Sequence, residues 1–131
     1  MSPEQEARER LIDEANYERG QIIARAREWN RTSPKFSSDN QCYDQAKALA
    51  KYLTNDQPWK YWSFKVIGGY KGLLPNFCSL HHHIMQADSS VKGAESFTLD
   101  PFQGPSNLFD HSVKASTPDK FWNEYPNREM Q

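Results

Sequence analysis

The hydrophobic pattern of this chain changes from a helical period to strict alternation near residue 61, and this change constrains the fold more than any other feature. Before residue 61, apolar residues recur at helical intervals in two separate segments. From residue 62 to residue 66, apolar and polar residues alternate, as in a strand with one buried face. Helices followed by strands predict an α+β fold in which helices pack on a small antiparallel sheet.

The first helix is predicted over residues 3–30, with Ser2 as its N-cap and Pro3 as its first residue. Its apolar stripe is narrow and its other face is densely charged, so it either packs on the domain or joins it to a longer polypeptide. We divide the chain into this helix and linker, residues 1–36, and the remaining segment, residues 37–131, which together form one compact domain. The stripe contains Leu11, Ala15, Ile22, Ala26 and Trp29.

The second helix is predicted to follow Ser38 or Asp39, either of which can serve as its N-cap, and to end near residues 55–58. This places Cys42 in the first turn, at the end of the buried stripe. The stripe continues through Ala46, Leu49, Ala50 and Leu53.

Strands are predicted over residues 61–69, 79–87 and 95–99, and the polar turn between the last two makes them an antiparallel hairpin. Residues 107–116 show no regular period. Thr117 as N-cap and Pro118 as first residue begin a short terminal helix.

Composition excludes several classes of function. The chain has 131 residues, 16 basic and 17 acidic, with a formal charge of −1 and no basic footprint for nucleic acid. It contains no apolar run of the roughly 18–20 residues that a membrane helix needs, and we expect no signal peptide in it. Cys42 and Cys78 are too few for a disulfide framework, so two free thiols in a reducing compartment are expected, with Cys78 structural.

Cys42, His83 and Asp100 are the candidate catalytic residues. An ordinary cysteine has a pKa of about 8.5, and a helix N-terminus or a nearby imidazolium lowers that pKa. His83 opens the second strand and Asp100 ends the third, so pairing of these strands is expected to bring the imidazole and the carboxylate together. His82 is the alternative base, because neighbouring residues of a strand point to opposite faces.

Other interpretations of the same residues remain open at this point. Cys42 taken alone is more typical of a small buried side chain on the helix stripe than of a nucleophile. A zinc hydrolase would use His81 and His83 as ligands, completed by His111, Asp110 or Asp100. A noncatalytic protein-binding module would use exposed aromatic residues. The aromatic candidates are Trp59, Tyr61, Trp62 and Tyr70.

The order of these motifs resembles the papain-like and transglutaminase-like cysteine enzyme superfamily, and most closely the papain-fold toxin domains of bacterial polymorphic toxins and effectors. The resemblance covers about residues 38–125, and the order and spacing of its motifs carry it. The matching segments are residues 41–49, residues 82–85, residues 97–104 and the pair Phe121-Trp122.

The resemblance implies a Cys-bearing helix packed on a small antiparallel sheet, with a Cys42, His83 and Asp100 triad and no cofactor or metal. It implies glutamine deamidation, transamidation or peptide cleavage through a thioester. The backbone N–H of Cys42, with Asn40 or Gln41, would bind the oxyanion. Papain has a glutamine several residues before its cysteine, whereas the residue six positions before Cys42 is Phe36. The short chain leaves little room for a deep protease groove, which favours deamidase or transglutaminase chemistry over proteolysis.

The resemblance also implies a biological setting. Such domains are secreted effectors that act on a target protein in the cytoplasm of the target cell. A cognate immunity protein blocks them. Neither nucleic acid nor membrane is an expected partner.

Overall fold

A sheet with one helical layer on each face forms the described part of the chain, residues 2–32, 42–71, 81–101 and 113–128 of a computed structural model. Its five strands are antiparallel in the order β4-β3-β2-β1-β5, which confirms the predicted α+β class. The elements are α1 (Pro3–Thr32), α2 (Cys42–Asp56), β1 (Trp62–Tyr70), β2 (His81–Ser89), β3 (Phe97–Asp100), β4 (Lys114–Ser116), α3 (Pro118–Glu124) and β5 (Asn127–Arg128).

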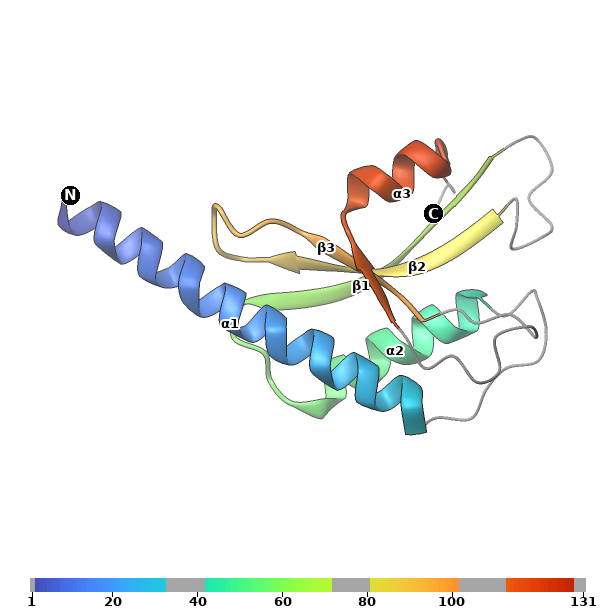
Figure 1. The fold of residues 1–131 in the computed structure, drawn as a ribbon, viewed down its shortest axis with the longest axis horizontal. Coiled ribbons are helices and arrows are strands. Elements are labelled where there is room, and N and C mark those ends of the chain that lie inside the picture. Colours follow the sequence, from blue (N-terminus) through green and yellow to red (C-terminus); the bar gives the residue numbers. More distant parts are fainter. Residues whose placement is uncertain (1, 33–41, 72–80, 102–112, 129–131) are drawn as a thin grey trace.

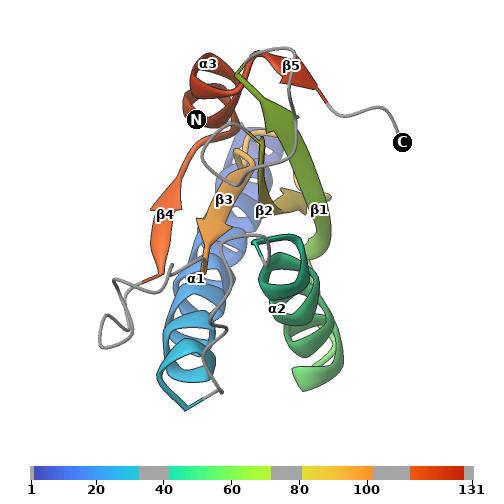
Figure 2. The same ribbon diagram turned by 90° about the vertical axis from the view of Figure 1, so that its right-hand side faces the viewer.

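Helices α1 and α2 lie on one face of the sheet and α3 lies on the other (Figures 1 and 2). The larger core fills the space between α1, α2 and the sheet, and a smaller cluster lies under α3. Strand register decides which side chains enter which core. Met85 pairs with Val66 on β1 and with Leu99 on β3, so these three residues point to the α2 face.

The apolar stripe of α2 packs as its spacing predicts. Cys42, Ala46, Leu49 and Leu53 are buried. Ala50 is only partly buried, because it lies at the edge of the stripe. The end of the helix is fixed by Trp59, whose Nε1 donates to the carbonyl oxygen of Leu53 at 2.8 Å.

Helix α1 is attached to the sheet through polar contacts as well as through its buried stripe. Ala15, Ile22 and Ala26 are fully buried. Trp62 Nε1 donates to the carbonyl oxygen of Ala15 at 2.8 Å, and the Glu18 carboxylate accepts from the backbone N–H groups of residues 60 and 61. The first turns are different, since Leu11 is 44% exposed although it belongs to the predicted stripe. Within the described residues, no helix is both long enough and apolar enough to span a bilayer.

Helix α3 covers the reverse face of the sheet. Thr117 is its N-cap, as predicted, and its side chain accepts from the backbone N–H of Lys120 at 3.3 Å. Phe121 and the following Tyr125 pack on Ile67 and Ile84. The position of α3 is therefore set by an apolar cluster separate from the larger core.

The strand boundaries differ modestly from the expectation. The hairpin of β2 and β3 is confirmed, but β2 continues to Ser89 and β3 begins at Phe97. Residues 79 and 80, the predicted start of β2, lie outside the described residues. Strand β4 falls within the segment predicted to be irregular, and β5 was not predicted. A strand of two or three residues is too short to show a hydrophobic period, so pairing with a neighbouring strand determines whether the segment becomes a strand.

Gly69 determines how closely the C-terminal segment approaches β1. A Cβ at this position would lie 2.9 Å from the carbonyl oxygen of Tyr125 and 3.1 Å from its Cβ. We expect Gly69→Ala to lower the free energy of unfolding by about 1–3 kcal/mol, because the backbone must move to relieve the contact. Urea unfolding followed by tryptophan fluorescence measures this loss.

Gly20 is the matched control for Gly69. It is exposed on α1, and a Cβ there meets nothing within 4 Å. Gly20→Ala should raise the free energy of unfolding by roughly 0.5–1 kcal/mol, because alanine is the better helix former. Equal stability of Gly69→Ala and the unsubstituted chain would contradict the close approach.

Candidate functional site

Cys42 and His83 meet where the start of α2 lies against β2. Cys42 is the first residue of α2, and its Sγ lies 3.9 Å from Nδ1 of His83. The same sulfur lies 4.0 Å from the carbonyl oxygen of His81. Both side chains are buried, Cys42 at 3% and His83 at 7% exposure. A thiol and an imidazole at this separation form the nucleophile and base pair that thiol catalysis uses, and such contacts tighten when substrate binds.

The pleat of β2 explains why His83 is the histidine that faces α2. His81, His83 and Met85 alternate along one face of the strand, and Met85 belongs to the core under α2. Gly68 of β1 pairs directly with His83. Directly paired residues share a face, so the position beside the imidazole carries no side chain that could displace it toward or away from Cys42.

Aromatic rings surround the imidazole of His83. Its centroid lies 4.5 Å from that of His81 and 5.0 Å from that of Tyr43, which presents an edge at an interplanar angle of 75°. Tyr43 is 43% exposed, so it forms the rim between His83 and solvent. Tyr43 was not among the predicted site residues, although its place directly after Cys42 in the first turn of the helix is a signal that the sequence contains.

Asp100 lies on the reverse face of the sheet, against His82. Nε2 of His82 and Oδ2 of Asp100 are 2.7 Å apart. Leu99 pairs with Met85 on the α2 face, so the next residue, Asp100, points to the α3 face together with His82. The predicted pairing of an imidazole with Asp100 occurs, but with His82, while Cys42 is brought to His83.

Several residues considered in the sequence lie outside the described ranges. They are the oxyanion candidates Asn40 and Gln41, the second cysteine Cys78, and the metal-ligand candidates Asp110 and His111. Among residues 2–32, 42–71, 81–101 and 113–128, no group of three or more His, Cys, Asp or Glu side chains is arranged to hold a metal ion.

The aromatic residues considered for a binding surface are all buried or partly buried. Trp62 is 6% exposed and packs edge to face on Phe97, with ring centroids 4.9 Å apart. Tyr61 is 8% exposed. Trp59 and Tyr70 are partly buried.

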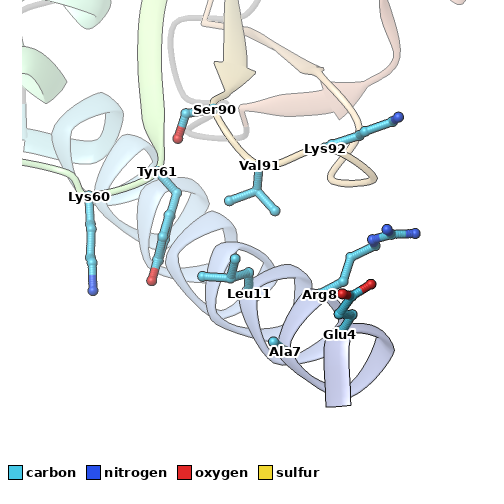
Figure 3. A pocket seen from close by; sticks show the side chains of 9 residues that line it. All are labelled: Glu4, Ala7, Arg8, Leu11, Lys60, Tyr61, Ser90, Val91 and Lys92. Carbon is cyan, nitrogen blue, oxygen red and sulfur yellow. The ribbon is translucent and has the colours of Figure 1, made fainter. Parts of the chain in front are cut away.

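A groove of about 630 Å³ lies between the N-terminal half of α1 and the turn that joins β2 to β3 (Figure 3). Gly93 in this turn has a φ of +98°, a conformation that glycine adopts without strain. The described residues that line the groove include no cysteine or histidine, so the pair of Cys42 and His83 lies elsewhere. Its lining includes Ala7, Leu11 and Val91 and the basic side chains of Arg8, Lys60 and Lys92.

Comparison of the chain with models of known families, with curated proteins and with solved structures gave no match.

Proposed function

We propose that this chain is a cysteine-dependent amidohydrolase or acyltransferase with a papain-like or transglutaminase-like core, acting on a protein amide. The observation that carries the proposal is the 3.9 Å contact between Cys42 Sγ, at the start of α2, and His83 Nδ1. A thiol beside an imidazole and at a helix N-terminus is in the setting that stabilises a thiolate.

The reaction proceeds through a thioester. His83 accepts the thiol proton as Cys42 Sγ attacks the amide carbonyl carbon. His83 then returns the proton to the departing nitrogen, which leaves as ammonia from a glutamine side chain or as an amine from a peptide bond. Water or an acceptor amine attacks the thioester carbon and gives its proton to His83, and the thiol is released. Water completes deamidation or cleavage, and an amine completes transamidation.

Backbone N–H groups at the start of α2 are the proposed oxyanion donors. The first N–H groups of a helix have no intrahelical acceptor, and they are aligned with the positive end of the helix dipole. The N–H of Cys42 is one of them, and Asn40 and Gln41 remain side-chain candidates in the preceding segment. These donors would stabilise the negative charge that develops on the carbonyl oxygen.

His83, rather than His82, is the proposed base. His82 and its hydrogen-bonded Asp100 occupy the reverse face, from which the imidazole has no route to Cys42 except through the sheet. Asp100 therefore acts on the catalytic pair only indirectly. By holding His82 on the reverse face it fixes the backbone of β2 next to His83.

The depth of Cys42 favours a glutamine side chain as substrate. The thiol belongs to a residue that is 3% exposed, and Tyr43 stands at the rim. A carboxamide at the end of a flexible side chain reaches a buried sulfur more easily than a peptide bond in a folded backbone does. We therefore prefer deamidation or transamidation to general proteolysis. We propose that the chain carries out this reaction as a bacterial effector or toxin domain that a cognate immunity protein blocks.

Thiol ionisation tests the proposal directly. The ultraviolet absorbance of the thiolate, taken as the difference between the unsubstituted chain and Cys42→Ala, should appear at a pH at which an ordinary thiol is still protonated. Alkylation by iodoacetamide, located by mass spectrometry, should follow the same pH profile. Both signals should move to higher pH in His83→Ala.

Cys78 is the internal control for alkylation. It carries the same group in the same chain and should react with the profile of an unactivated thiol. A Cys42 absorbance profile that matches that of an ordinary thiol, and that is unchanged in His83→Ala, would show a structural cysteine and remove the basis of the proposal. Absorbance does not depend on reagent access, so burial of Cys42 cannot mimic that result.

A further inference from the structure

A polar cavity of about 290 Å³ lies on the reverse face of the sheet, between α3 and strands β2, β3 and β4. The register explains its lining. Thr98 pairs with Ser116 and Asp100 pairs with Lys114, so these four side chains share the face that α3 covers. Helix α3 forms the opposite wall of the cavity with Phe121 and other side chains.

The two carboxylates of this cavity already have basic partners. Asp100 contacts His82 at 2.7 Å, and Glu124 forms an ion pair with Lys71 at 3.3 Å. Lys114 and Lys120 also line the cavity, and neither forms an ion pair with any of the described residues. Two ammonium groups that no carboxylate of the described residues holds therefore line the same small cavity.

Hydrogen-bond donors lie deeper than the lysines. Thr98 is 2% exposed and His82 is 7% exposed, and the Ser116 hydroxyl lies beside Thr98 across the β3–β4 pair. Hydroxyl groups donate to anionic oxygens without adding charge. Ile84 and Phe121 provide an apolar wall that excludes water and strengthens these interactions.

We propose that this cavity binds a small oxyanion, a carboxylate or a phosphate, with Lys114 and Lys120 neutralising its charge and Thr98 and Ser116 donating hydrogen bonds. The volume is close to the lower limit of about 300 Å³ for ligand pockets, which suits an anion of a few heavy atoms. The site is separate from Cys42 and His83, because the sheet stands between them.

Titration of the full chain with inorganic phosphate, and in parallel with malonate, tests the proposal at constant ionic strength. The NMR signals of the Phe121 and Tyr125 rings and of the His82 imidazole report on occupancy. We expect saturable shifts with at least one of the two anions. A response to malonate alone would identify a carboxylate site, and a response to phosphate alone would identify a phosphate site.

The double variant Lys114→Gln and Lys120→Gln should weaken binding by about tenfold or more, since each lysine contributes a charge-assisted hydrogen bond. Lys92→Gln is the matched control, because Lys92 lines the separate groove at α1, and binding should be unchanged. Absence of saturable shifts with both anions, or equal affinity in the double variant, overturns the proposal.

Cys42→Ala separates this proposal from the proposed reaction. This variant should bind the anion with unchanged affinity, because Cys42 lies on the other face of the sheet. Failure of the thiol experiment would therefore leave the anion site standing. Failure of the anion titration would likewise leave the thiol chemistry untouched.

Discussion

Replacement of Cys42 by alanine should lower amide turnover by on the order of 10⁴-fold or more, because the thiol that His83 activates, and with it the thioester at this site, is then lost. His83→Gln should cause a loss of similar size, since the thiol then lacks its base. The double variant should lose little more than either single variant, as expected for residues that act as a unit. Ammonia release and amine incorporation on a glutamine-bearing test protein measure the two possible outcomes.

Asp100→Asn and His82→Gln are the controls that distinguish the two faces of the sheet. If His82 and Asp100 only hold β2 in place, each variant should lose less than roughly 10²-fold, far less than Cys42→Ala. A loss in Asp100→Asn as large as that in His83→Gln would show that Asp100 orients the catalytic imidazole itself. Retention of more than about a tenth of the activity in Cys42→Ala would contradict the thioester mechanism.

Phe97→Ala should lower the free energy of unfolding by about 3–5 kcal/mol, the largest stability effect that we expect from a single substitution in the described residues. Phe97 is fully buried, packs edge to face on Trp62, and lies 4.8 Å from the Arg19 guanidinium carbon. Its removal opens a cavity between α1 and the sheet and also removes an aromatic pair. Linear extrapolation of urea unfolding measures the loss.

Tyr17→Ala is the matched control on α1. Tyr17 is 71% exposed, so its removal opens no cavity, and the free energy of unfolding should change by at most about 0.5 kcal/mol. A loss below about 1 kcal/mol for Phe97→Ala would mean that the core collapses around the vacated space. The slope of the free energy with urea should be the same in both variants, because the surface exposed on unfolding is nearly unchanged.

The fold class could be predicted because its longer elements carry strong local signals. The stripe that begins at Cys42 fixes a helix, and the alternation that begins at Trp62 fixes a strand. Strands β4 and β5 have three and two residues. Such short segments become strands only because a neighbouring strand supplies hydrogen-bond partners, so the sequence near them contains no comparable signal.

The candidate site could be predicted in part for the same reason. The position of Cys42 at the start of a helix is a local property, and the sequence determined it. The partner of each histidine depends on register, because a shift of one residue turns a side chain to the other face. Register here depends on the pairing of Met85 with Leu99, which places Asp100 beside His82.

By itself the sequence determined the order of the three helices and the first three strands, the buried stripe of α2 and the residue types available for chemistry, because these follow from the local period and from side-chain chemistry. Only the tertiary structure decided that Cys42 meets His83, that Asp100 meets His82, and that Lys114 and Lys120 converge on one cavity. These pairings join residues distant in the chain through strand register and helix packing, and no local pattern specifies either.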